Sequence, residues 1–223
     1  FKEFNSNALK KLLTEEVFSF ANVPYRIKKY PEILKDPRST IEFDYKLDEQ
    51  LKSNEKLYGS DEKFLKKKDQ TLVQVSMMEK LLLTLLVKMS NFIPDGGIWM
   101  NTQRPEWNDA KNALVGYGIS MVTLFYLRRY VNFLKNLLSD NSIKAFKLSI
   151  EITAFFNAIN QVILQLTTIY NESINDKDRK KIVDRLGVAG SEYRTKIYEQ
   201  GFSGEKKEVL VSEIIKFGDL CIS

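Results

Sequence analysis

Residues 96–110 read Gly-Gly-Ile-Trp-Met-Asn-Thr-Gln-Arg-Pro-Glu-Trp-Asn-Asp-Ala, and this short polar and aromatic stretch separates two strongly apolar segments. It holds both tryptophans of the chain, together with two carboxylates, two asparagines, a glutamine and an arginine. A long polar connection between apolar helices is usually functional in a compact domain. The stretch is therefore predicted to form one wall of an active site on a helical scaffold.

The segments on either side of this stretch have the apolar spacing of α-helices. Residues 70–92 carry apolar side chains on nearly every face, which is typical of a helix buried from more than one side. A second apolar helix follows the stretch and is predicted to end near residue 138, and the two would form a helical hairpin. The same spacing predicts further helices over 5–21, 142–173, 176–200 (broken at residues 187–190) and 205–220.

The remaining segments are predicted to be irregular or exposed. Prolines break residues 22–45, and residues 46–70 are polar and charged, so we expect an exposed loop, a small two-stranded element or a lid. No alternating run of strand residues and no Asn-Gly hairpin is found. The fold class is therefore predicted to be mainly α, built from helical hairpins in a single domain spanning residues 1–223.

Composition narrows the function classes. The net charge of +5 comes from lysines interleaved with acids, and only Lys66-Lys67-Lys68 forms a compact basic run, so nucleic acid is not the expected partner. Residues 152–170 are uncharged and long enough to span a bilayer, but they include several amides, so no membrane span is expected. The chain has no histidine and one cysteine, Cys221, which removes Ser-His-Asp, Cys-His and the usual zinc chemistry from this chain alone. We expect a soluble protein whose compartment cannot be read from its cysteine content.

The residue types in the stretch suit a sugar. Trp99 and Trp107 offer flat apolar faces on which the C–H face of a pyranose ring can stack. The hydroxyls at the ring edge need hydrogen-bonding partners, and the stretch supplies them as Asn101, Gln103, Arg104, Asn108 and Asp109. A carboxyl at Glu106, beside Trp107 and near the second carboxyl of Asp109, should hold its proton more tightly. Such a group can act as the general acid in cleavage of a glycosidic bond.

The same residues also have a purely structural interpretation. Pro105 followed by Glu106 is typical of a plain helix N-terminus. Asn108 and Asp109 could cap a helix, and both tryptophans could be core residues. The alternative to an enzyme is thus a non-catalytic helical binding or scaffolding module.

The segment Arg104-Pro105-Glu106-Trp107-Asn108-Asp109-Ala110 resembles the Asp-Trp-Asn-Asp-Gly signature of the cellobiose phosphorylase family and related six-hairpin glycosidases. The resemblance implies that Glu106 is the general acid and that Trp107, Asn108 and Asp109 shape the sugar subsite. Two positions depart from the signature, because Glu106 replaces an aspartate and Ala110 replaces a glycine. Both departures weaken the case for phosphorolysis.

The family fold is an (α/α)6 barrel, which needs more helices than this chain can supply. The resemblance therefore implies part of a barrel, and the absence of an initial methionine agrees with a fragment of a longer protein. An inverting hydrolase also needs a second carboxylate, for which Glu151 and Glu192 are candidates only by elimination. The expected function is a glycoside hydrolase or phosphorylase-like enzyme that acts on an oligosaccharide or glycoside, with no cofactor and no metal.

Overall fold

The computed structural model describes residues 3–101, 114–139, 143–169 and 174–222. Within these ranges the fold is mainly α, and short antiparallel strand pairs join the helices. The helices are α1 (Ser6–Thr14), α2 (Tyr30–Lys35), α3 (Tyr45–Tyr58), the 3₁₀ helix η1 (Ser60–Lys63), α4 (Met77–Met89), α6 (Met121–Leu138), α7 (Ile150–Ile169), α8 (Asp176–Gln200) and α9 (Val211–Ile222). The strands are β1 (Phe18–Ser19), β2 (Tyr25–Ile27), β3 (Ile41–Phe43), β4 (Gln74–Val75), β5 (Phe92–Ile93), β6 (Gly97–Trp99), β7 (Ile119–Ser120), β8 (Ala145–Ser149) and β9 (Lys206–Leu210).

Side-chain caps fix where the principal helices begin. Ser76 caps α4 by accepting a hydrogen bond from the backbone N–H of Glu79 at 3.2 Å. Ser120 caps α6 in the same way through the N–H of Thr123 at 3.0 Å. An N-cap of this kind satisfies a backbone donor that has no partner inside the helix. The predicted hairpin of two apolar helices around residues 96–110 is thus present as α4 and α6.

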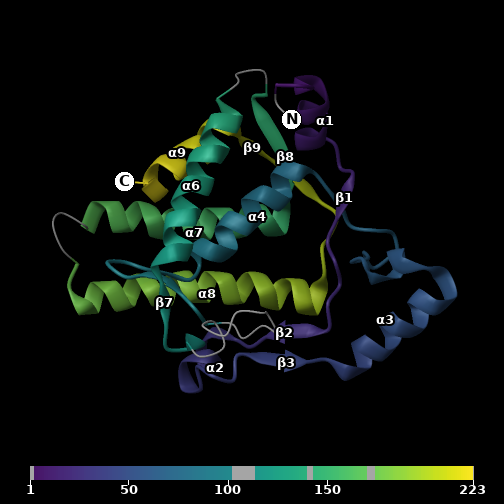
Figure 1. Ribbon diagram of the computed structural model, residues 1–223, viewed down its shortest axis with the longest axis horizontal. Coiled ribbons are helices and arrows are strands. Elements are labelled where there is room, and N and C mark those ends of the chain that lie inside the picture. Colours follow the sequence, from purple (N-terminus) through teal and green to yellow (C-terminus); the bar gives the residue numbers. More distant parts are fainter. Residues whose placement is uncertain (1–2, 102–113, 140–142, 170–173, 223) are drawn as a thin grey trace.

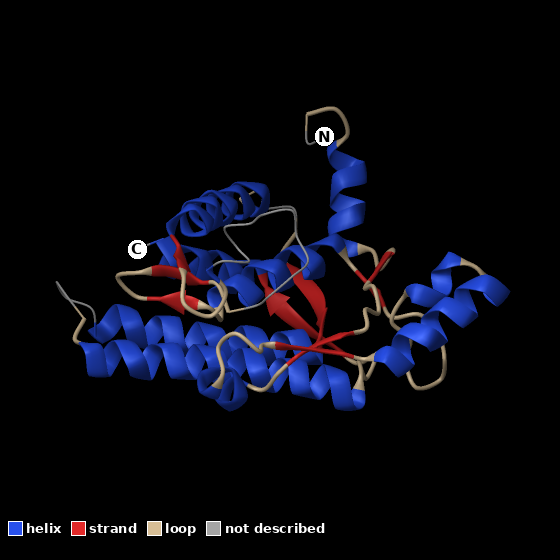
Figure 2. Cartoon of the chain, turned by 60° about the horizontal axis from the view of Figure 1, so that its bottom comes forward, coloured by secondary structure: helices blue, strands red, loops and turns tan. Residues whose placement is uncertain are grey.

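The core lies among α4, α6, α7, α8 and α9 (Figure 1). α7 and α8 run side by side, and both views show this pair as a long double layer (Figures 1 and 2). Aromatic pairs join the helices: Phe155 of α7 stacks on Tyr193 of α8 with ring centroids 4.7 Å apart, and Phe156 meets Phe217 of α9 at 5.3 Å. α4 lies between its neighbours with Leu82 and Leu86 fully buried, as its apolar sequence predicts.

Among the described residues, strands occupy parts of five segments that were predicted to be helical: β1 within 5–21, β4 and the start of β5 within 70–92, β7 before α6, β8 within 142–173 and β9 within 205–220. Residues 145–149 and 206–210 form the antiparallel pair β8–β9, and each strand leads directly into a helix, α7 or α9. Phe146, Leu148 and Val209 bury their side chains in the core. β8 alternates apolar and polar residues from Phe146 to Ser149, which is a strand signal that the helix prediction missed, whereas β9 (Lys-Lys-Glu-Val-Leu) shows no such alternation. The two paired segments lie about 60 residues apart in the chain. A prediction from the local spacing of apolar residues therefore placed the starts of α7 and α9 too early.

α8 is one unbroken helix, so the predicted break at residues 187–190 is wrong. The glycines in this segment allow close packing instead. A Cβ on Gly187 would lie 2.2 Å from Cε2 of Tyr30, and a Cβ on Gly190 would lie 2.9 Å from Oγ of Ser90. The missing side chains therefore let α2 and the end of α4 pack directly on α8.

Residues 46–70 also differ from the predicted loop or two-stranded element. Most of the first half is α3, which begins because the carboxylate of Asp44 accepts a hydrogen bond from the N–H of Leu47 at 2.9 Å. Only Leu51 of this helix is buried, and α3 stands at the edge of the molecule, away from the main group of helices (Figures 1 and 2). A polar helix of this kind lacks the apolar stripe by which a helix is recognised in a sequence.

Within the described part of the chain, one helix, α7, is long and apolar enough to span a membrane by those two criteria. Its buried side chains belong to the core, and it contacts α4, α8, α9 and the β8–β9 pair.

Candidate functional site

The predicted connection starts and ends on one small antiparallel sheet. β6 pairs with β5 on one side and with β7 on the other, and Trp99 lies opposite Ile119. Beyond the strands, the N–H of Met100 donates to the carbonyl of Gly118 at 2.9 Å, and the N–H of Gly116 donates to the carbonyl of Met100 at 2.7 Å. The two ends of the stretch are therefore held together between α4 and α6, on what we call the connection base (residues 97–101 and 114–120).

A glycine and a left-handed residue make this base possible. Asp95, with φ 57°, turns the chain between β5 and β6. Gly116 has φ 81°, and a Cβ there would lie 2.2 Å from the carbonyl oxygen of Pro37. Both the backbone conformation and the close approach of Pro37 therefore require glycine at position 116. The contact also brings the base against the chain that follows α2.

Trp99 and Asn101 are the two predicted sugar-binding residues that the structure describes. Trp99 is half-buried, and its indole N–H donates to the carbonyl of Gly116 at 3.1 Å. Asn101 is 7 % exposed, and its amide N–H donates to the side-chain oxygen of Asn91 at 2.7 Å. These polar groups are bonded to the protein, so both residues fasten the base. Contact of either residue with a sugar stays a prediction.

The other predicted site residues lie outside the described ranges. They are the two candidate catalytic carboxylates and four candidate sugar-binding residues: Glu106, Asp109, Gln103, Arg104, Trp107 and Asn108.

Arg194 of α8 is a partly buried charged residue that the sequence did not distinguish. A Cβ on Gly190 would lie 3.2 Å from Nη1 of Arg194 and 2.9 Å from Oγ of Ser90, so the guanidinium folds back over Gly190 near the C-cap of α4. Its Nε is buried and has no hydrogen-bond partner. Burial lowers the pKa of Arg194, because the charged form loses its hydration. In the sequence it is one of many basic residues on a charged helix, and only its packing distinguishes it.

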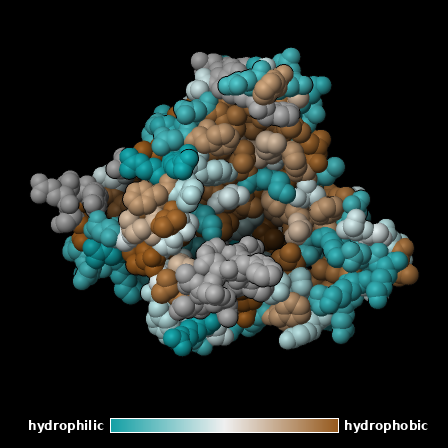
Figure 3. All heavy atoms as spheres, viewed as in Figure 1, coloured by the Kyte–Doolittle hydropathy of each residue, from teal (hydrophilic) through white to brown (hydrophobic). Residues whose placement is uncertain are grey.

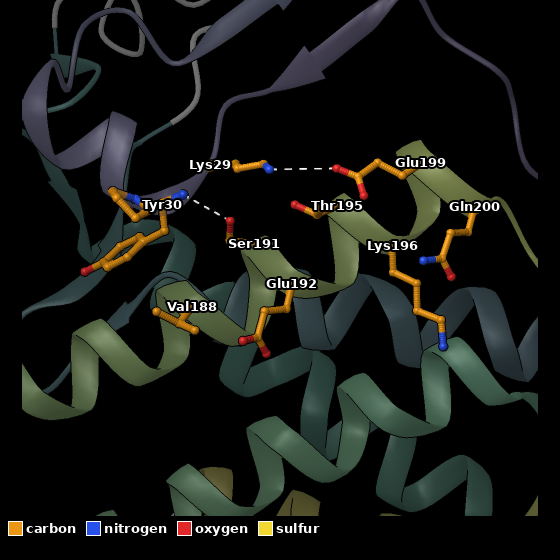
Figure 4. A pocket seen from close by; sticks show the side chains of 10 residues that line it. Lys29, Tyr30, Val188, Ser191, Glu192, Thr195, Lys196, Glu199 and Gln200 are labelled. Atoms are coloured by element: carbon orange, nitrogen blue, oxygen red, sulfur yellow. Dashed lines mark hydrogen bonds and ion pairs between the residues drawn. The ribbon is translucent and has the colours of Figure 1, made fainter.

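The surface also has hollows that could take a ligand. The face seen in Figure 3 is hollowed near its centre, where apolar atoms form the floor. A second hollow of about 510 Å³ follows α8 and is drawn in Figure 4. Glu192 projects from one side of α8 there, whereas Lys29 and Glu199 form an ion pair of 3.8 Å across the other side. Glu192 is exposed, as is typical of a solvated helix face.

Glu151, the other candidate second carboxylate, is in a different environment. It lies in the first turn of α7, is 2 % exposed, and accepts a hydrogen bond from the N–H of Ser203 at 2.9 Å. It lines a third hollow, of about 410 Å³, which is distinct from that of Glu192, although both hollows share Lys196 and Gln200. The structure therefore separates the two candidates by burial and by position.

A buried charge cluster lies close to these groups. Glu79 of α4 is fully buried; it accepts from Ser149 and lies 3.1 Å from Nζ of Lys206. Burial raises the pKa of Tyr193 most, and the negative charges of Glu79 and Glu151 raise it further. Glu79 is thus fully satisfied, which is typical of a structural ion pair. Among the described residues, no group of three acidic or cysteine side chains is arranged to hold a metal ion.

Comparisons with known proteins add no further assignment to this geometry. No family model matches the chain, and no curated protein is significantly similar to it in sequence.

Proposed function

We propose that the chain is part of a carbohydrate-active protein of the six-hairpin type that cleaves a glycosidic bond by general-acid catalysis. Hydrolysis is the favoured reaction, and phosphorolysis is the alternative reaction. The observation that supports this proposal best is the connection base. It closes a long, polar, tryptophan-containing connection onto the ends of two core helices, α4 and α6. Catalytic side chains are often carried by connections that a rigid scaffold positions.

In this proposal Glu106 donates its proton to the glycosidic oxygen as the bond from that oxygen to the anomeric carbon breaks. The anomeric carbon is then attacked by water, whose proton passes to a second carboxylate, or by a phosphate oxygen. Trp107 and the ring face of Trp99 form the platform for the sugar. Asp109 lies near the acid, and the side chains of Gln103, Arg104 and Asn108 hydrogen-bond the sugar hydroxyls, while Asn101 keeps the connection in place.

The proposed fold is part of an (α/α)6 barrel. Two helix pairs support it, since α4 and α6 flank the connection and α7 and α8 pack as an antiparallel hairpin. Further hairpins and the second catalytic carboxylate would come from residues outside this chain.

The alternative is a non-catalytic helical binding or scaffolding module. A specific observation favours it: the polar groups of Trp99 and Asn101 are hydrogen-bonded to Gly116 and Asn91 rather than left free for a ligand. In that case the stretch would serve only to join the helices.

Replacement of the acid separates the two proposals. We expect the full-length protein that contains this chain to release monosaccharide from at least one member of a disaccharide panel that includes cellobiose, assayed with and without inorganic phosphate. Glu106→Gln should lower kcat by about 10²–10⁴-fold and leave the dissociation constant for the disaccharide, measured by calorimetry, nearly unchanged.

Glu208→Gln is the matched control, because Glu208 is an exposed residue of β9 and the charge change is the same. Equal turnover in the two variants would refute the role of Glu106. Binding of a disaccharide without any cleavage by the wild type would favour the non-catalytic module.

A further inference from the structure

The hollow that contains Glu151 has the features of a second binding site. It is formed by the turn at residues 67–69, the first turn of α7, the last turns of α8 and the segment 201–203. Its volume of about 410 Å³ is within the usual range for a small-molecule site. It lies apart from the connection base in the sequence, and it includes Glu151 but neither Glu106 nor Asp109.

The walls of this hollow are fixed by hydrogen bonds. The backbone N–H of Lys67 donates to the carbonyl of Thr71 at 2.8 Å and closes the turn that carries Lys67. The carboxylate of Asp69 accepts from the N–H and the hydroxyl of Thr71, and these bonds, with the hydroxyl contributing most, lower its pKa. On the opposite wall, the bond from the N–H of Ser203 to Glu151 ties the segment after α8 to the start of α7. The site is therefore preformed.

Three lysines give the hollow a positive rim. Lys67, Lys68 and Lys196 all line it, and none makes an ion pair with another described residue. Lys66, the first member of the same basic run, differs, since it pairs with Glu62 at 2.6 Å. The three ammonium groups outnumber the two carboxylates of the hollow, Asp69 and Glu151, so the rim attracts an anion.

Glu151 adds a different requirement. Its Oε1 is bonded to Ser203, but its Oε2 is buried and has no hydrogen-bond partner. A buried acceptor without a donor is unfavourable, so a ligand that brings a donor is favoured here. The side chains of Lys196 and Gln200 project on the same side of α8, and both line this hollow (Figure 4). Both side chains are exposed.

These features select among small anions. A free amino acid would place its ammonium group among three lysines, which repel it. A nucleotide base would need an exposed aromatic face. Phe202, the aromatic residue of the lining, is 4 % exposed and stacks on Phe20 at 5.5 Å. A polyhydroxylated anion has no such conflict.

We propose that this hollow binds a phosphorylated sugar, with the phosphate held by Lys67, Lys68 and Lys196 and a sugar hydroxyl donating to Glu151. The proposal does not depend on the proposed function, because it concerns binding at other residues.

Calorimetry on the purified chain tests the ligand class, with glucose 6-phosphate as the probe and glucose and inorganic phosphate as comparators. We expect glucose 6-phosphate to bind at least about tenfold more tightly than either comparator, since charge-assisted and hydroxyl hydrogen bonds both contribute. The proposal is overturned if glucose 6-phosphate does not bind, or if inorganic phosphate binds as tightly as the sugar phosphate.

Substitutions then locate the site. Lys196→Gln should weaken glucose 6-phosphate binding about tenfold, whereas Lys181→Gln, an exposed lysine of the same helix outside the hollow, should not. Equal losses in both variants would show a general charge effect and overturn the assignment.

Glu151→Gln keeps a side-chain oxygen for the N–H of Ser203, so the variant should fold. It should weaken binding of glucose 6-phosphate and leave binding of inorganic phosphate unchanged. Equal loss for both ligands, or no loss for either, would contradict the role of Glu151. Lys196→Gln, at an exposed position, decides the proposal if Glu151→Gln does not fold.

Discussion

At the scale of single residues, Lys206 forms an ion pair with the fully buried carboxylate of Glu79. Glu79 is fully buried, and its two oxygens are bonded to Ser149 and Lys206. Lys206 also lies 3.4 Å from Glu16, so one ammonium group joins α4, β9 and the segment after α1. The pair is a structural device, because every oxygen of Glu79 has a partner.

Removal of the lysine should therefore destabilise the fold strongly. Lys206→Ala leaves the carboxylate of Glu79 buried without a counter-charge, which should lower the free energy of unfolding by about 3–5 kcal/mol. Urea unfolding followed by circular dichroism measures the change.

Lys207→Ala is the control on the same strand, since Lys207 is exposed. Its effect should stay within about 0.5 kcal/mol. Similar midpoints for the two variants would contradict a buried ion pair at Glu79.

The residue scale also shows what the sequence can reveal about a site. The density of Trp, Asn and acidic residues between positions 99 and 109 drew attention to the connection, and the closed base shows that this stretch is anchored. The bonds of Trp99 to Gly116 and of Asn101 to Asn91 could not be foreseen, because they depend on which residues the sheet brings together. Nor could Arg194 be separated from other basic residues without its packing.

At the scale of elements, α8 shows how glycine can serve a helix rather than end it. The ring of Tyr30 occupies the space that a side chain at position 187 would need. The hydroxyl of Tyr30 reaches Asp184 one turn earlier, at 2.9 Å, and burial together with this bond raises its pKa. These two contacts pack helix α2 against α8.

Gly187→Ala tests this arrangement. Alanine is favoured over glycine in a helix by about 1 kcal/mol, but its Cβ would collide with Tyr30, and overpacking of this kind destabilises by about 1–3 kcal/mol. We expect a net loss of stability in urea unfolding.

Val188→Ala provides the comparison at the next position, because Val188 is 40 % exposed. This variant should be nearly neutral. A stabilised Gly187→Ala protein would mean that the contact with Tyr30 does not constrain the helix.

Elements with strong local signals were predicted well, and those that depend on distant partners were not. α4 and α6 follow from their apolar periodicity, but both begin later than predicted, at the caps Ser76 and Ser120 that the sequence prediction did not identify. β9 has no local strand pattern and depends on pairing with β8 across about 60 residues, whereas the short alternation of β8 from Phe146 to Ser149 was missed. α3 replaces the predicted loop, two-stranded element or lid, and its mostly polar surface gave little helical signal.

At the scale of the whole molecule, the mainly α class follows from the sequence, whereas the complete barrel remains a proposal. The described helices bury one continuous core, with the connection base between α4 and α6. The proposed sugar-phosphate hollow lies where α7 begins and α8 ends. If both proposals hold, one chain presents a catalytic site and a separate anion site on different loops of the same helical scaffold.

The most direct test of the proposed catalytic site is a crystal structure of the Glu106→Gln variant with cellobiose, or with whichever panel disaccharide the wild type cleaves fastest. Our account predicts a sugar ring stacked on Trp107, with the glycosidic oxygen within hydrogen-bond distance of the side chain at position 106. A disaccharide bound elsewhere, or both indoles packed in the core with no sugar beside them, would contradict it.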